Sequence, residues 1–185
     1  MMKNEYEATF LNVDHSSLRR QIKSHNGILK KKRTLCSRLI FENEVTNKNK
    51  SWVRLRDEGD KISLTLKQVN NEDIIDGTKE IEFTVSDLDL TKEFLLGLGL
   101  QCVRYQQNYR EQWQLDGASI DLDEWPDLEP YVEIEAHSKA EVRKLSEKLG
   151  FRWDDAVYGS VDKIYRQVKG RDILKESTLL FTKSK

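Results

Sequence analysis

The sequence predicts an antiparallel α+β fold. Segments with strand character outnumber those with helix character, and most of them are joined by short turns that carry Gly or Asp. A weak strand–helix repeat occurs three times, at 5–27, 80–99 and 133–150. Two prolines and the lack of a Gly/Ser-rich linker indicate a single domain over residues 1–185.

Each repeat predicts a strand followed by an amphipathic helix. The first repeat ends at a glycine, Gly27. In the second, Ser86 with Asp89 has the spacing of a helix capping box, and Gly99 suits the helix end. The third has the same spacing at Ser138 and Glu141 and ends at Gly150, so we expect helices before all three glycines.

The other strands are recognised by alternating apolar and polar residues and by the turns between them. The segments 56–61 and 114–119 have the Gly and Asp of hairpin turns, while 42–51 and 69–77 are polar and are expected to be loops. The tail from Ser177 is expected to include a short final strand. The predicted strands are 28–42, 52–58, 61–68, 101–115, 117–123 and 130–136.

The composition excludes several classes of protein. A formal net charge of −1 argues against a general nucleic-acid binder, which is normally strongly basic. Two cysteines without a CxxC pair form no disulfide framework. The N-terminus lacks the apolar stretch of a signal peptide, and no apolar run approaches the length of a membrane span. We therefore expect a cytoplasmic protein that binds neither nucleic acid nor membrane; a homodimer stays open.

Charged residues are segregated by sign along the predicted strands. "VRLR" is basic at Arg54 and Arg56, whereas "EIEF" and "YVEIEA" are acidic at alternate positions. Alternate side chains of a strand share one face, so each pair stands side by side opposite an apolar face. The same alternation places these further charged residues on the polar faces of their strands: Lys67, Glu80, Glu82, Arg104, Arg110, Asp121, Asp123, Glu133 and Glu135.

A sheet with one solvated face is the usual explanation of such alternation. A wet surface normally mixes Thr, Ser and Gln with both signs of charge, whereas these faces are almost wholly charged and single-signed. Like charges side by side repel unless an opposite charge lies between them. If the sheet curls so that acidic and basic strands face one interior, the arrangement suits a polyanion held with divalent cations, because carboxylates bind Mg²⁺ or Mn²⁺ and Arg and Lys bind phosphate.

The order and spacing of these motifs resemble the CYTH superfamily, the triphosphate tunnel metalloenzymes, which include class IV adenylyl cyclases and thiamine triphosphatases. The resemblance spans about Glu5 to Arg166, through "EYE", "VRLR", "TLK", "EIE", "NYREQW", "DLDEWP" and "YVEIE". It implies an eight-stranded antiparallel β-barrel, a tunnel with helices packed outside. It also implies a charged lumen that binds a small-molecule triphosphate or nucleotide with Mg²⁺ or Mn²⁺.

The resemblance assigns roles to the matching residues. The expected metal ligands are Glu5, Glu7, Glu133 and Glu135, assisted by Asp121 or Asp123. The expected phosphate ligands are Arg54, Arg56, Lys67, Arg104 and Arg110. Glu80 and Glu82 are expected to be lumen acids that orient these cations or a second metal. The residues expected to act in catalysis are Glu5, Glu7, Arg56 and Lys67.

Two features depart from the family pattern. The signature ExExK has Thr9 at its last position, so no charge is supplied to a phosphate there. The aromatic "HF" element that precedes this motif in adenylyl cyclases is missing. The sequence thus favours a metal-dependent triphosphate hydrolase; an adenylyl cyclase and a non-catalytic binder of polyphosphate or nucleotide are the alternatives, and the identity of the triphosphate stays open.

Overall fold

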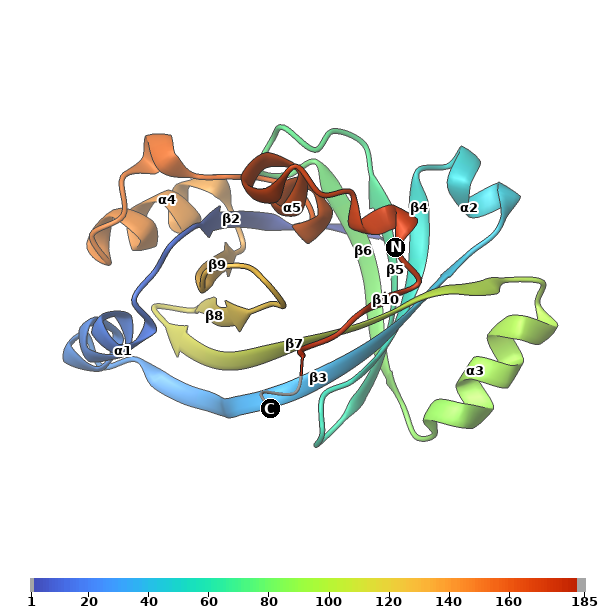
Figure 1. The fold of residues 1–185 in the computed structure, drawn as a ribbon. Helices are drawn as coiled ribbons and strands as arrows, with labels where there is room; N and C mark the ends of the chain where they lie inside the picture. The colour runs from blue at the N-terminus through green and yellow to red at the C-terminus, as the bar shows by residue number, and fades with distance from the viewer. Residues whose placement is uncertain (1, 183–185) are drawn as a thin grey trace.

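Nine strands of this protein form a nearly closed antiparallel barrel in the computed structural model, which describes residues 2–182 (Figure 1). The strands in this part of the chain are β1 (Lys3–Asn4), β2 (Tyr6–Phe10), β3 (Ile28–Glu42), β4 (Ser51–Asp57), β5 (Ile62–Val69), β6 (Thr78–Val85), β7 (Gln101–Leu115), β8 (Ala118–Glu124), β9 (Tyr131–Ala136) and β10 (Thr178–Leu179). The helices are α1 (His15–Ser24), α2 (Glu44–Lys48), α3 (Leu88–Gly97), α4 (Lys139–Lys148) and α5 (Val161–Lys169), with short 3₁₀ turns η1 (Trp153–Asp155) and η2 (Ile173–Lys175).

The N-terminal segment closes the barrel. The strands are ordered β1-β6-β5-β4-β3-β7-β8-β9-β2, so the first two strands lie at opposite ends of the sheet. They are consecutive in the chain and are separated by Glu5 alone, so one segment pairs with β6 through β1 and with β9 through β2. The expected tunnel with helices outside is confirmed. The expected count of eight strands becomes nine among the described residues because the first strand is interrupted at Glu5.

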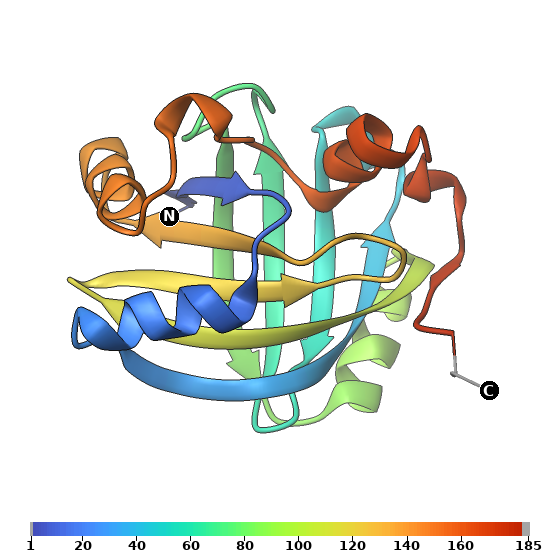
Figure 2. The ribbon, with the colours of Figure 1, turned by 60° about the vertical axis from the view of Figure 1, so that its left-hand side comes forward.

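The barrel is flattened into two layers that cross. In Figure 2, β2, β9, β8 and β7 run across the front, and β4, β5 and β6 run nearly at right angles behind them. The long strands β3 and β7 pair with each other and connect the two layers.

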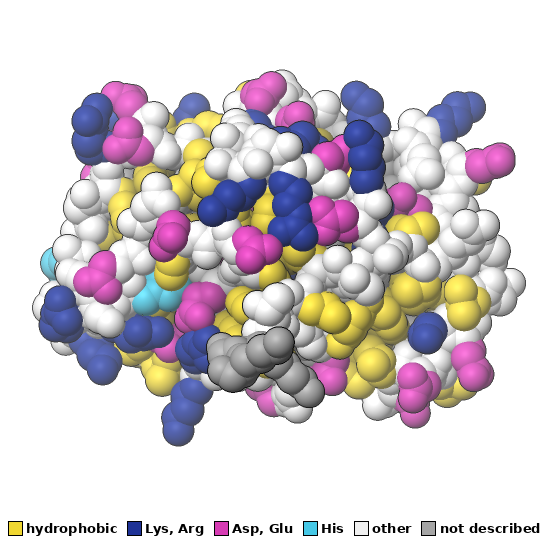
Figure 3. Space-filling view, viewed as in Figure 1, with side chains coloured by type: hydrophobic (Ala, Val, Ile, Leu, Met, Phe, Trp, Pro, Cys, Tyr) yellow, Lys and Arg dark blue, Asp and Glu magenta, His cyan; other side chains and the backbone are white. Residues whose placement is uncertain are grey.

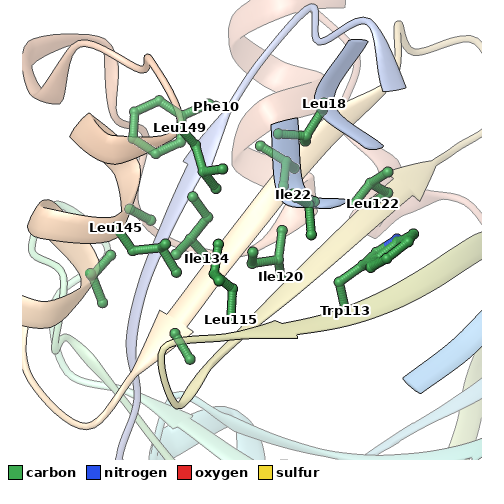
Figure 4. Close-up of a cluster of buried hydrophobic side chains, with 14 of the residues drawn as sticks. Phe10, Leu18, Ile22, Trp113, Leu115, Ile120, Leu122, Ile134, Leu145 and Leu149 are labelled. Atoms are coloured by element: carbon green, nitrogen blue, oxygen red, sulfur yellow. The ribbon is translucent and has the colours of Figure 1, made fainter. Parts of the chain in front are cut away.

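The main apolar core lies between the front layer and the helices outside it. Ile120 and Ile134 project outward from β8 and β9 and meet Ile22 of α1 and Leu145 of α4 (Figure 4). The opposite faces of the same strands carry the charged residues and line the lumen. The alternation in the sequence thus separates an apolar outer face from a charged inner one.

The predicted strands are confirmed to within a few residues. The β7–β8 turn consists of Asp116 and Gly117, both with positive φ, which is the geometry of a two-residue hairpin. The tail contributes β10, which pairs parallel with β7; its last residues, 183–185, lie outside the described residues.

The helix ends differ from expectation in one place. The N-cap of α3 is Asp87, whose side chain accepts from the Leu90 N–H at 2.8 Å, and not Ser86. Both residue types are good caps; β6 ends at Val85 and α3 begins at Leu88, so Ser86 lies between the strand and the cap.

Two helices were not expected from the sequence. The segment 42–51, expected to be a loop, contains α2, and α5 is the second. No helix in residues 2–182 is long and apolar enough to cross a membrane.

Candidate functional site

A cavity of about 870 Å³ lies inside the barrel, between its two layers. Twelve of the thirteen predicted site residues line it: Glu5, Glu7, Arg54, Arg56, Lys67, Glu80, Glu82, Arg104, Arg110, Asp121, Glu133 and Glu135. Asp123 is fully buried behind them and contacts Arg110. Strand alternation therefore brings together residues from seven strands and from the Glu5 break, as the sequence predicts.

One side of the cavity is basic. Arg54 and Arg56 project inward from β4, and the neighbouring strand β3 places Arg38 directly opposite Arg56. Burial and the crowding of Arg54, Arg56 and Arg110 lower the pKa of Arg38 to about 9. The pKa of Arg54 is lowered as well, by burial and by Arg56. We call Arg38, Arg54 and Arg56 the basic wall.

Two donors of the basic wall have no partner. The Nε atoms of Arg38 and Arg54 are buried and make no hydrogen bond to any described residue. A buried donor without a partner costs free energy, so such groups are usually matched by a ligand or by water. The unpaired nitrogens and the lowered pKa values together fit a site that binds an anion.

Arg38 was missed by sequence reasoning. It lies in the apolar run "LCSRLIFE", where a single arginine gives no paired pattern. The local signal that could have found it was strand parity: Arg38 lies two residues before Ile40, and both face the cavity. Only the β3–β4 register shows that it stands beside Arg56.

The other side of the cavity is acidic. Glu7 of β2 is paired with Glu135 of β9, and Glu133 lies two residues before Glu135 on the same face. Burial raises the pKa of Glu133 to about 7, with Asp123 and Asp121 adding to the rise against the opposing effect of Arg110. Burial and Glu5 raise the pKa of Glu135 to about 7. Burial, Glu133 and the other nearby acids raise that of Glu7 well above its ordinary value. We call Glu7, Glu133 and Glu135 the acidic wall.

Lys67 lies between Glu5 and Glu80. Its Nζ is 2.7 Å from Glu5 Oε1 and 3.4 Å from Glu80 Oε2. Burial alone would raise the pKa of Glu5, but Lys67 lowers it, whereas burial raises the pKa of Glu80. One lysine thus serves two carboxylates, and it is not free to bind a phosphate unless it leaves one of them.

Arg110 is held by three acids. It contacts Asp121 at 2.7 Å and also pairs with Asp123 and Glu133. Although burial alone would lower its pKa, these acids raise it well above the ordinary value. In this arrangement Arg110 neutralises acids and presents less charge to a phosphate than the basic wall does.

Other predicted residues are also paired. Glu82 accepts from Arg54 at 3.1 Å and from Thr65 at 2.7 Å, which fits a role in orienting the basic wall. Arg104 lies at the η2 end of the cavity, where it pairs with Glu42 and donates to the Leu174 carbonyl at 3.2 Å. Arg104 is therefore peripheral to the basic wall.

Glu58 also lines the cavity and was missed because it lies in the β4–β5 turn. It accepts from Arg56 Nε at 3.0 Å and from Ser63 at 3.1 Å. Burial would raise its pKa, but Arg56 and two lysines lower it to about 2. Glu58 fixes the guanidinium of Arg56 in place.

The acidic wall has the chemistry of a divalent metal site. Carboxylate oxygens are the ligands that Mg²⁺ and Mn²⁺ prefer, and a cation would offset the burial and the repulsion that raise the three pKa values. Within residues 2–182, no three acidic, His or Cys side chains converge closely enough to hold an ion as they stand. The donor set fits a metal, and binding one requires the side chains to rotate toward a common point.

Thr9 lies on the inner face but does not line the cavity. Its backbone N–H and C=O pair with Val157 at 2.9 Å each, and its side chain is buried. The position that carries lysine in the ExExK signature therefore supplies no cation to the cavity here.

A nearly closed β-tunnel with a basic and an acidic wall belongs to a class of fold whose lumen suits charged ligands. The model of the CYTH domain family matches residues 41–168, and the chain belongs to this family. No curated protein sequence matches it.

Solved structures share the fold at low identity. A proposed adenylate cyclase from Vibrio parahaemolyticus has a TM-score of 0.75 at 12% identity, covering 89% of this chain and 98% of its own. The PH1012 protein of Pyrococcus horikoshii has 0.68 at 19%, covering 82% and 93%. A proposed adenylyl cyclase from Hippeastrum, described as having a dominant triphosphatase activity, has 0.58 at 18%, covering 90% and 96%.

Proposed function

We propose that this protein is a metal-dependent hydrolase of a triphosphate: inorganic tripolyphosphate, thiamine triphosphate or a nucleoside triphosphate. One observation carries the proposal. A basic wall with unpaired donors faces an acidic wall with raised pKa values across one cavity. A polyphosphate with its divalent cation supplies both charges at once.

Membership of the CYTH family supports an enzyme of this kind. The Hippeastrum structure supports hydrolysis in particular, since the same fold there carries a dominant triphosphatase activity.

Each wall has its part in the proposed reaction. Arg54 and Arg38 turn their unpaired nitrogens to the phosphate oxygens, and Arg56, fixed by Glu58, neutralises charge that develops on the leaving group. Glu7, Glu133 and Glu135 would hold Mg²⁺ or Mn²⁺, which supplies charge neutralisation at the phosphoryl oxygens when bound. A lumen carboxylate orients the water that attacks the terminal phosphorus as the bridging P–O bond breaks.

The test is incubation with tripolyphosphate, thiamine triphosphate and ATP, each with Mg²⁺ or Mn²⁺, while phosphate and cyclic AMP are measured. We expect metal-dependent phosphate release from at least one substrate. Formation of cyclic AMP would instead identify a cyclase. Tight binding without turnover of any substrate would identify a binder and would agree with the missing lysine at Thr9.

Two arginine variants separate binding from folding. Arg54→Ala removes a crowded charge, so it should weaken tripolyphosphate binding by at least about tenfold without lowering the melting temperature of the unliganded protein. Arg110→Ala leaves three buried acids unpaired and should cost about 3–5 kcal/mol of unfolding free energy. Arg143→Ala, in an exposed pair on α4, is the control for both measurements.

A further inference from the structure

The helix α3 differs from the other surface helices in what it exposes. The outward sides of α1 and α4 are charged, whereas α3 exposes Leu90, Phe94 and Leu96 at 67%, 63% and 43%. Leu95 is its one buried residue. Large apolar side chains exposed together on one helix mark a surface that another molecule covers. Part of this surface is visible at the lower right of Figure 3, over α3 and the start of β7.

The strand β6 extends the same surface. Its outward residues Ile81 and Phe83 are exposed at 39% and 55%. Phe83 is paired with Leu64 of β5, and Leu64 packs in the cluster under α3 together with Leu95. The apolar surface therefore continues from the helix onto the sheet. We call Ile81, Phe83, Leu90, Phe94 and Leu98 the α3–β6 face.

We propose that the α3–β6 face binds a second copy of this chain, forming a two-fold dimer. At about 200 Å² for each large apolar side chain, its five residues expose on the order of 500 Å² of apolar surface. A stable interface buries about 800 Å² per partner, and a little over half of that is apolar. The exposed apolar area of this face thus equals the apolar area that one partner buries in a dimer interface of standard size.

The charges around the face fit a copy of itself. Lys79 lies on β6 at one edge, and Asp89 and Glu93 lie on α3 at the other. None of the three makes an ion pair with any described residue. In a two-fold contact that lays α3 of one copy against β6 of the other, Lys79 meets the acids of the partner twice, once on each side of the axis. A partner of one strong charge would not match both edges.

The face lies on the outside of the barrel, and none of its residues lines the cavity. The dimer is therefore independent of the proposed function, and either can fail without the other.

The experiment is sedimentation velocity on the full chain over a wide concentration range. We expect a species of twice the chain mass that dissociates on dilution. Phe83→Glu with Phe94→Glu should give a monomer at all concentrations with an unchanged circular dichroism spectrum, because both side chains are exposed within one chain. Val45→Glu is the matched control: Val45 is 65% exposed on α2, and this variant should dimerise as the wild type does.

A charge exchange tests the orientation. Lys79→Glu should weaken dimerisation by at least about tenfold, and adding Glu93→Lys should restore most of the loss. A wild type that is monomeric at every concentration overturns the proposal, whether or not another protein binds this face. A dimer that survives the Phe83 and Phe94 changes, or a charge exchange without rescue, also overturns it.

Discussion

Glu133 and Glu135 are carboxylates of the lumen whose ionised form destabilises the folded protein. Their ordinary pKa of 4.5 is raised to about 7 in both cases, chiefly by burial. Glu133 is even paired with Arg110, and the pairing does not offset the burial and the nearby aspartates. Residues selected for stability alone would not be placed in this way.

The raised pKa values predict how stability depends on pH. Between pH 4.5 and about 7 the folded protein binds more protons at Glu133 and Glu135 than the unfolded chain does. The unfolding free energy of the metal-free protein should therefore fall as the pH rises through this window. Glu133→Gln with Glu135→Gln removes both titrations, so the double variant should lose less stability over the same range.

Urea unfolding in the presence of a chelator, at several pH values across this window, measures the difference. Glu129→Gln, which changes an exposed acid, is the control and should follow the wild type. Parallel pH profiles for the wild type and the double variant would contradict the assignment of the raised pKa values to this pair.

At the scale of elements, α5 is held across one end of the cavity by charged contacts. Lys163 Nζ lies 2.7 Å from Asp73 and 2.8 Å from the Glu72 carbonyl, and Arg166 lies 3.4 Å from the Glu72 carboxylate. Glu72 and the first residues of α5 also line the cavity. The loop 70–77 and the helix therefore form one boundary of the site, although they are far apart in the sequence.

Breaking these contacts should make α5 and the loop 70–77 more mobile without unfolding the barrel. Lys163→Ala with Arg166→Ala should increase hydrogen–deuterium exchange in residues 156–170 and 70–77. Partly exposed ion pairs contribute at most about 1 kcal/mol each, so the melting temperature should change little. Arg143→Ala on α4 should leave exchange in both segments unaltered. Exchange confined to α5 alone would show that the loop is held by other contacts.

The elements also show what the sequence could predict. Strand alternation is a local property, so it placed twelve of the thirteen site residues in the lumen. Asp123 has the same parity, but only the packing of Arg110 and Asn108 shows that it lies behind the lining. The helix α5 is short and ends at Gly170 in the left-handed region; its position depends on contacts with Glu72 and Trp125 that no local pattern encodes. Arg38 was missed for the same reason, since only the register between β3 and β4 places it beside Arg56.

At the scale of the whole molecule, the two walls make metal and anion binding depend on each other. A cation on the acidic wall attracts an anion held by the basic wall across the same cavity. Each ligand also removes repulsion within its own wall. The two binding free energies should therefore be coupled, and by linkage the coupling is the same from either side.

Thermal melting of the wild type tests this coupling. Mn²⁺ with tripolyphosphate should raise the melting temperature by more than the sum of the rises from each alone, because both stabilise the folded state by mass action. Sodium chloride at matched ionic strength controls for screening. Glu7→Gln removes one negative charge from the acidic wall. In this variant the rise in melting temperature with both ligands should be closer to the sum of the two separate rises. Strictly additive rises in the wild type would show that the two ligands do not share this cavity.

The closure of the barrel by residues 3–10 also has a consequence for how the protein is made. Glu7 pairs with Glu135, so β2 is synthesised well before β9, the strand that it pairs with. Until β9 has been synthesised, the segment has an unpaired edge and the charged lumen is open to solvent. Contacts so distant in sequence form slowly and leave the nascent chain exposed to association. Residues 3–10 are thus synthesised long before the strand β9 whose pairing with them closes the barrel.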